Sequence, residues 1–517
     1  MATEPPGHYP PLDGPRRALV TLSLALAVFM NILDISIANV SIPTIAGYLG
    51  VSAENGTWII TSFAVSNAIA VPISGWLARR VGEVRLFVAC TLLFTLLSWV
   101  CGLAFSFPML LVARALQGAV AGPMIPLSQS LLLANYPPEQ RGFANGIWGM
   151  TAVVGPVAGP ILGGWITDNI NWSWIFYINV PVGLVAAWTT WTLLRDRETA
   201  TTRRQPIDVV GLALLIVWVA CLQIMLDKGN DRGWFGSPEI LTLGLTSFVA
   251  FGFFVVWELT EAHPVVDLTL FARRNFAIAA IAMSLGYMAF FAAIVILPLW
   301  LQTQQGYTAT WAGLATSSIG ILGIVSSPIV GRLADKVDTR ILITIGFLIF
   351  AAVSFVNADA STNITFGQLF LPRLLWGIGT ACFFIPLITL SLSGLHPTEL
   401  ASASGLFNFV RLLALGFGTS ISVTLWDRWA TQHDHDLTAN LTAYSPQTLQ
   451  WLDQAQALGL SGAQSLEALA NTVTQQAFML ANNDIFWVSG WVFLGLVGLI
   501  WLAGPTDRSA GQAVAGD

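Results

Sequence analysis

Four charged side chains lie inside long apolar stretches of this sequence, and they are the residues best placed to do chemistry. They are Asp34, Arg114, Arg373 and Arg411. A charge at the centre of a lipid-facing helix costs about 2.5–3.5 kcal/mol even on the most lenient scale, so such side chains face a cavity or a partner. Desolvation drives a carboxylate towards its neutral form, and a nearby cation drives it back to the charged form. We therefore predict that Asp34 with Arg114 takes up and releases a proton.

Asp34 and Arg114 are expected to lie at a similar depth in the membrane. A helix rises about 1.5 Å per residue, which places Asp34 about 25 Å up a hydrocarbon core of about 30 Å and Arg114 about 9 Å below its outer surface. The structural alternative is that Asp34 caps a helix kink together with Asn31 and Asn39. Intramembrane carboxylates are functional by default, so proton coupling is the favoured interpretation.

Arg411 has two interpretations of about equal weight. It lies close in sequence to Asn408, Gly416 and Gly418. Its guanidinium therefore either contacts a substrate or braces its own part of the protein by reaching backbone carbonyls. The polar side chains expected to line a central cavity, or to control its conformation, are Asn39, Gln117, Arg373, Asn408 and Arg411.

The composition indicates which elements position these residues. Hydrophobic residues make up 55% of the chain and charged residues 10%, against about 25% charged in an average soluble protein. The mean hydropathy is +0.70, which indicates a polytopic membrane protein surrounded by membrane lipids. Neither Lys228 nor Lys336 lies in a phosphate-cradling G-x4-G-K-[ST] loop, so an ATP engine of that kind is excluded. We expect no cofactor or metal and no nucleic-acid partner, because the four cysteines lack ligand spacing and the net charge is only −6.

Fourteen apolar runs are long enough to cross a bilayer. Most of the 22 lysine and arginine residues then fall in loops on one side, which places both termini in the cytoplasm. The expected organisation is a disordered cytoplasmic lead at 1–15, a six-helix bundle at 16–200, a two-helix insert at 201–265, a second six-helix bundle at 266–503 and a cytoplasmic tail at 504–517.

The longest segment between spans, residues 426–484, is expected on the outer side. Its apolar residues have approximate helical spacing, which predicts one or two amphipathic helices on the membrane surface or against a partner. The run from His433 to Asp436 could be interpreted as a metal site, but a short polar cluster without a companion site is usually a solvated loop.

A stripe of glycines marks one span, with Gly155, Gly159 and Gly163 four residues apart. Residues four apart share a helix face, so a second backbone can approach this face closely. Pro156 and Pro160 each remove a backbone donor from the helix. The pattern favours a helix that rocks against a neighbour, and plain helix packing is the alternative.

The chain also contains an internal repeat. The loop Gly75–Arg85 recurs as Gly331–Arg340, and Arg114 with Gly118 recurs as Arg373 with Gly377. Duplicated halves that face a central cavity are how secondary transporters build alternating access.

Together these motifs resemble the major facilitator superfamily, and within it the 14-helix drug:proton antiporters of the EmrB type. The glycine stripe resembles the helix-5 antiporter motif, and the run from Leu33 to Pro43 resembles the helix-1 signature of the 14-helix branch. Two loops resemble the family's cytoplasmic gate motif through Gly75, Arg79, Arg80, Gly82, Arg85, Gly331, Asp335 and Arg340.

The resemblance implies an all-α fold of two pseudo-symmetric six-helix bundles plus two inserted helices. It further implies proton-coupled export of small hydrophobic drugs across a bacterial inner membrane. The implied partners are a periplasmic adaptor, for which residues 426–484 are the candidate docking surface, and an outer-membrane channel.

One residue departs from the family pattern. Arg79 occupies the loop position where an acidic residue is expected, whereas Asp335 keeps it in the second loop. A latch through that carboxylate is therefore in doubt in the first half, although Glu83 could replace it. A competing function class, a membrane enzyme or lipid flippase, would need a metal or donor-substrate site in residues 426–484.

Overall fold

The computed structural model describes residues 12–51, 53–137, 140–197, 208–230, 232–395, 399–439, 441–442 and 445–505. Regular structure in these residues is helical throughout, in agreement with the expected all-α class. The predicted lead at 1–15 ends earlier than expected, because α1 already begins at Gly14. Residues 1–11 of the lead, 198–207 around the start of the predicted insert and 506–517 of the predicted tail lie outside the described residues.

The first group of helices begins with proline in the first turn of α1, where a missing N–H costs no hydrogen bond. Gly82 separates α3 from α4 with φ of 98°, a conformation that favours glycine. The helices of this group are α1 Gly14–Tyr48, α2 Ala53–Gly56, α3 Trp58–Val81, α4 Glu83–Gly102, α5 Phe107–Ala121, α6 Met124–Ala134, α7 Arg141–Asn169, α8 Trp174–Tyr177 and α9 Asn179–Leu194.

Several of the later helices start at polar caps. The Thr308 side chain accepts from the backbone of Trp311 at the start of α13, and Ser461 with Gln464 forms a capping box at the start of α18. These helices are α10 Val209–Lys228, α11 Pro238–Thr260, α12 Arg274–Thr303, α13 Ala309–Ala334, α14 Thr339–Asn357, α15 Phe366–Ser391, α16 Leu400–Ala439, α17 Pro446–Ala457 and α18 Gly462–Ile500.

Twelve helical segments of the described residues are long and apolar enough to cross a membrane, with α5 and α6 together forming one of them. The expected count of fourteen is not reached on this measure. The two expected spans outside the twelve correspond to α7, which has 29 residues, and to the short α8 followed by α9, which has 16.

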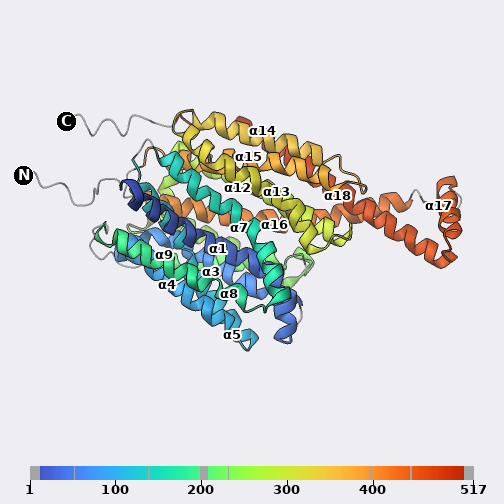
Figure 1. Ribbon diagram of the computed structural model, residues 1–517, viewed down its shortest axis with the longest axis horizontal. Helices are drawn as coiled ribbons and strands as arrows, with labels where there is room; N and C mark the ends of the chain where they lie inside the picture. The colour runs from blue at the N-terminus through green and yellow to red at the C-terminus, as the bar shows by residue number, and fades with distance from the viewer. Residues whose placement is uncertain are drawn as a thin grey trace, which may run out of the picture.

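The helices form two groups that lie side by side (Figure 1). The blue-to-green group contains α1 and α3 to α9, and the yellow-to-red group contains α12 to α18. α7 packs against α1 within its own group and against α13 of the other group, and α16 packs against α3. The two groups therefore meet along α7 with α13 and α3 with α16.

α10 and α11 lie at the periphery. In the most apolar window of α11, 22% of the residues are buried, against 78% for the central helix α15. The end of α10 nevertheless reaches both groups: Lys228 Nζ donates to Thr57 Oγ1 at 2.8 Å, and Ser420 Oγ donates to the Leu226 carbonyl at 2.6 Å.

Residues 426–484 form an arm of three helical pieces. α16 continues to Ala439, α17 lies at the tip, and α18 runs back from Gly462 into the bundle. The arm projects from one end of the molecule (Figure 1). Helical structure was correctly expected in this segment, but as separate amphipathic helices. Instead, the bundle helices α16 and α18 extend into the arm.

Candidate functional site

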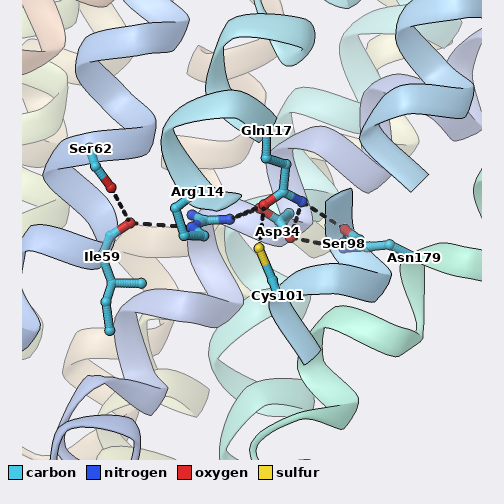
Figure 2. A network of polar contacts seen from close by, with 8 residues as sticks. All are labelled: Asp34, Ile59, Ser62, Ser98, Cys101, Arg114, Gln117 and Asn179. Atoms are coloured by element: carbon cyan, nitrogen blue, oxygen red, sulfur yellow. Dashed lines mark hydrogen bonds and ion pairs between the residues drawn. The ribbon is translucent and has the colours of Figure 1, made fainter. Parts of the chain in front are cut away.

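Asp34 and Arg114 are in direct contact inside the first group of helices (Figure 2). Arg114 Nη1 lies 2.5 Å from Asp34 Oδ2, and both residues are 0% exposed. The same guanidinium donates to Gln117 Oε1 at 2.8 Å and through Nε to the Ile59 carbonyl at 3.2 Å. The expectation that the two charges lie at a similar depth is thus met by an ion pair between α1 and α5.

Two further polar side chains complete the environment of the carboxylate. Asn179 Nδ2 donates to Asp34 Oδ1 at 2.8 Å and to Ser98 Oγ at 3.1 Å. Gln117 Nε2 donates to Ser98 Oγ at 2.6 Å and to Asp34 Oδ1 at 3.4 Å. The ionised form of Asp34 is therefore held by one cation and two amides, supplied by α5 and α9.

Sequence reasoning missed Asn179 and Ser98 as members of this site. Asn179 is a polar residue at the start of an apolar span, and this position could have marked it as a candidate site residue. The sequence gives no such indication for Ser98, because a serine within a membrane helix usually bonds its own backbone. A contact across helices is set only by the fold.

Aromatic rings close the site around Arg114. Its Cζ lies 4.3 Å from the ring centre of Phe63 and 5.6 Å from that of Phe176. Rings stabilise a guanidinium through cation–π attraction and exclude water from the ion pair. Loss of charge on either partner in such a setting is costly, because the other charge is left buried without compensation.

The alternative role of Asp34, capping a helix kink together with Asn31 and Asn39, is not supported by the contacts of Asn31. Asn31 Nδ2 donates to the Ala121 carbonyl of α5 at 3.1 Å instead. Asn39 belongs to α1, and its side chain lies outside the described part of the structure.

The glycine stripe of α7 faces α1, the helix that carries Asp34. A Cβ built on Gly155 would lie 2.5 Å from Ile32 Cγ2, and one on Gly163 would lie 3.0 Å from the Ile37 carbonyl oxygen. At Gly159 it would overlap Ser36. The predicted close approach of a second backbone is thus present. The side chains of Pro156 and Pro160 lie outside the described part.

The loop Gly331–Arg340 contacts the start of α7. Asp335 accepts from the backbone N–H groups of Gly142 at 2.7 Å and Phe143 at 3.2 Å. A carboxylate at a helix N-terminus is stabilised by the free N–H groups and the helix dipole. Gly331 also lies against this part of α7, where a Cβ on it would be 2.5 Å from the Gly142 carbonyl oxygen. The acid of the second loop therefore joins the two groups of helices.

The loop Gly75–Arg85 makes a different contact. Arg79 Nη1 donates to Ser402 Oγ of α16 at 2.6 Å, and a Cβ on Gly75 would lie 2.6 Å from the same oxygen. Glu83, the possible substitute acid, accepts from Ser130 Oγ within its own group. An arginine thus makes the cross-group bond at the position where the family pattern has an acid.

Arg80 and Arg340 contact residues of their own groups, whereas Arg332 lies over the Phe143 ring of the other group at 4.8 Å. Arg80 lies over the Trp76 ring at 5.3 Å, and Arg340 pairs with Asp338 at 2.6 Å. Arg85 is exposed. The contacts of Arg80 and Arg340 give no evidence of a latch at these two positions.

In the second group, Arg373 and Arg411 are both enclosed. Arg373 is 0% exposed and donates from Nη2 to the Ala293 carbonyl at 3.2 Å. Arg411 is 6% exposed and lies over the Tyr287 ring at 5.8 Å. Asn408 is buried and bonds Ser404 of its own helix. A hydrogen bond to a backbone carbonyl, which was considered for Arg411, is observed for Arg373 instead.

The polar run in the arm makes ordinary contacts. His433 Nε2 lies 2.7 Å from Asp484 Oδ2, and Thr474 Oγ1 donates to Asp434 Oδ1 at 3.3 Å. Among the residues that the structure describes, no three His, Cys, Asp or Glu side chains are grouped to hold a metal ion.

The sequence is similar to curated exporters over nearly its whole length. Multidrug export protein EmrB of Haemophilus influenzae is 50% identical over 498 residues, which cover 96% of this chain and 98% of the relative. Multidrug export protein EmrB of Escherichia coli K12 is 49% identical over 97% of this chain and 98% of the relative. Fatty acid resistance protein FarB of Neisseria gonorrhoeae is 48% identical over 97% and 99%.

The fold has a solved counterpart in the human organic anion transporter MFSD10. The two structures align with a TM-score of 0.60 over 94% of this chain and 100% of that protein, at 12% identity, which shows a shared fold. The family model described as Major Facilitator Superfamily matches residues 24–419. With this match and relatives at about half identity, the chain belongs to the major facilitator superfamily.

Proposed function

We propose that the protein is a proton-coupled antiporter that exports hydrophobic toxic compounds across the inner membrane of a bacterium by alternating access. The observation that carries the proposal is the buried ion pair of Asp34 and Arg114. The export of multiple drugs is suggested by the names of the relatives that are about half identical over nearly the whole chain.

The ion pair supplies a reason for coupling. A proton on Asp34 removes the negative charge that compensates Arg114, so the pair must rearrange when the site is protonated. Asp34 lies on α1 between Ile32 and Ser36, which contact the glycine stripe of α7. A shift of α1 on protonation is thereby passed to α7, which also contacts α13 of the other half. Protonation from the outside then releases the drug, and deprotonation inside restores drug binding.

We further propose that α7 and the α8–α9 pair cross the membrane, which gives fourteen spans. The halves are then residues 16–200 and 266–503, with 201–265 as the insert. Both termini lie on one side in this arrangement. In support, Leu12 N–H donates to the Asn135 carbonyl and Arg340 Nη1 donates to the Ala503 carbonyl, so both described ends contact loops of the same face.

The arm of residues 426–484 is the proposed docking surface for a periplasmic adaptor, which would pass drugs to an outer-membrane channel. Its support is the projection of α16, α17 and α18 beyond the bundle (Figure 1). Leu449, Leu458 and Leu466 are 47%, 85% and 58% exposed there. These leucines are the proposed contact residues for the adaptor.

Proteoliposomes containing a pH-sensitive dye test the coupling. Drugs of cationic, neutral and weakly acidic type are added to the wild type, to Asp34→Asn, and to Asp359→Asn as a matched control at an exposed acid. We expect drug-induced proton movement in the wild type and the control, and none above background in Asp34→Asn, since an amide does not titrate. Undiminished exchange by Asp34→Asn would remove the ion pair from the mechanism.

A further inference from the structure

Two acidic side chains are buried at the end where α10 begins and α11 finishes. Asp208 is the N-terminal cap of α10, and Glu258 lies in the last turn of α11. Asp208 is 9% exposed and Glu258 is 3% exposed. In the proposed topology this end of the two helices lies on the cytoplasmic side. Neither acid belongs to the Asp34 site, so the burial of both needs a separate reason.

Each of the two carboxyl groups has one oxygen with donors and one without. Asp208 Oδ1 accepts from the backbone N–H of Gly211 at 2.8 Å and from Trp257 Nε1 at 2.9 Å. Glu258 Oε2 accepts from the backbone N–H of Val266 at 3.1 Å. Asp208 Oδ2 and Glu258 Oε1 are enclosed and have no hydrogen-bond partner among the described residues. A buried charged oxygen without a partner is costly, so this arrangement favours a bound cation or proton.

The two unpartnered oxygens lie against the same glycine. A Cβ built on Gly211 would lie within 2.6 Å of both Asp208 Oδ2 and Glu258 Oε1, so the two oxygens are at most 5.2 Å apart, which is twice that distance. Two enclosed carboxylates at such a separation repel each other strongly when both are ionised. A proton on one of them removes this repulsion and supplies a donor for the free oxygen of the other.

The surroundings favour a proton over a metal ion. The charged residues that act on Glu258 among those described are both acids, Asp208 and Glu261. Asp267, in the loop that follows α11, interacts with Arg79 of α3 instead. A divalent cation such as Ca²⁺ takes six or more oxygen ligands, and the described residues contain no group of three acidic, histidine or cysteine side chains that could hold a metal.

We propose that Asp208 and Glu258 share one proton and form a second proton-binding site, separate from Asp34 and Arg114. The shared proton joins the cap of α10 to the last turn of α11 and holds the two helices together at this end. Loss of the proton at alkaline pH leaves two repelling carboxylates in the same enclosed position. The site goes beyond the proposed function, because it needs neither a drug nor proton-coupled transport.

The pair is connected to a contact between the two groups of helices. Glu258 accepts from the backbone of Val266, and the next residue, Asp267, interacts with Arg79. Arg79 in turn donates to Ser402 of α16 in the other group. Repulsion within the pair displaces the loop that carries Asp267, so an alkaline cytoplasm is expected to loosen this contact.

Infrared difference spectra of the full-length protein in lipid nanodiscs test the shared proton. Ordinary aspartate and glutamate side chains are ionised by about pH 6, so a carboxylic-acid C=O band that disappears between about pH 6 and pH 9 reports a retained proton. We expect Glu258→Gln and Asp208→Asn each to lose one carboxylic acid from this band, because each leaves a single carboxylate. Glu239→Gln, at an exposed acid near the other end of α11, is the matched control and should equal the wild type.

Thermal stability gives a second measurement with a defined sign. The folded protein keeps a proton that the unfolded chain releases, so the melting temperature of the wild type should fall as the pH rises through the titration of the pair. Glu258→Gln has no second charge to repel, so it should show a weaker fall and melt above the wild type at about pH 9. A purely structural role of Glu258 would instead lower the melting temperature of the variant equally at every pH.

The opposite outcomes overturn the inference. An infrared band that is unchanged in both variants, or a wild-type pH dependence of melting in Glu258→Gln, refutes the shared proton. A rise in melting temperature on addition of Mg²⁺ or Ca²⁺ at alkaline pH, lost in both variants, would assign the pair to a metal ion and also refute it. None of these measurements uses a drug, so they stand apart from the test of proton-coupled export.

Discussion

Replacement of Gly331 by alanine is expected to shift the balance between the two conformations of the proposed alternating-access cycle. A Cβ at this position would lie 2.5 Å from the Gly142 carbonyl oxygen and 3.1 Å from the Cα atoms of Phe143 and Gly146. All three are backbone atoms of α7 in the other half, so no side chain can rotate away. The added methyl group therefore blocks the contact between the halves at this face.

The magnitude follows from the nature of the contact. Overpacking of a tight site costs about 1–3 kcal/mol. Alanine also stabilises a helix by about 0.5–1 kcal/mol relative to glycine. Because residue 331 stays in α13 in both conformations, this gain does not change the ratio of their populations. The clash exists only when the halves touch. The population in which this face is apart should therefore rise by about 5- to 150-fold relative to the closed population.

Distances between spin labels on the two halves measure this ratio. Val81 and Ile341 are exposed at this face and belong to different halves, so each can carry a label after the four native cysteines are replaced by alanine. Gly164→Ala is the matched control, because a Cβ there has no neighbour within 4 Å. A distance distribution for Gly331→Ala that equals that of the control would refute the reasoning.

Three further changes test other contacts. Gly159→Val should leave the protein in the membrane but abolish export, because a branched side chain holds α7 away from Ser36; export at the wild-type rate would reduce the glycine stripe to plain packing. Asp335→Ala removes the cap of α7 and should cost about 1 kcal/mol of thermal stability, measured by the melting temperature in detergent against Asp359→Ala; equal melting would contradict the cap. Deletion of residues 436–475 should preserve transport in vesicles and remove resistance in whole cells, and loss of transport in vesicles would instead assign the arm to the transporter core.

Sequence patterns predicted the helical class and the proximity of Asp34 and Arg114 for identifiable reasons. A charge inside an apolar span is so costly that Asp34 and Arg114 stand out at once, and the constant helical rise placed them at one depth. Glycine spacing predicted a close helix contact at Gly159. Each of these signals is local or depends on one regular geometry.

Other features depend on which helices become neighbours, and the sequence does not contain that directly. Asn179 joins the site because α9 packs beside α4 and α1. Arg79 contacts Ser402 because α3 meets α16, which no loop motif specifies. The arm was expected as separate pieces because its polar composition resembles a loop, whereas α16 and α18 each run without a break between the bundle and the arm.

The continuity of α16 has a mechanical consequence. The helix runs without a break from Leu400 in the bundle to Ala439 in the arm, so its outer part is a rigid lever. The part beyond Trp426 is about 20 Å long at the usual helical rise, so a tilt of the second half by about 10° moves its tip by roughly 3.5 Å. A small rotation of the bundle thus becomes a displacement of atomic size at the tip of the arm, and in the proposed alternating-access cycle a protein held there would be pushed once in every cycle.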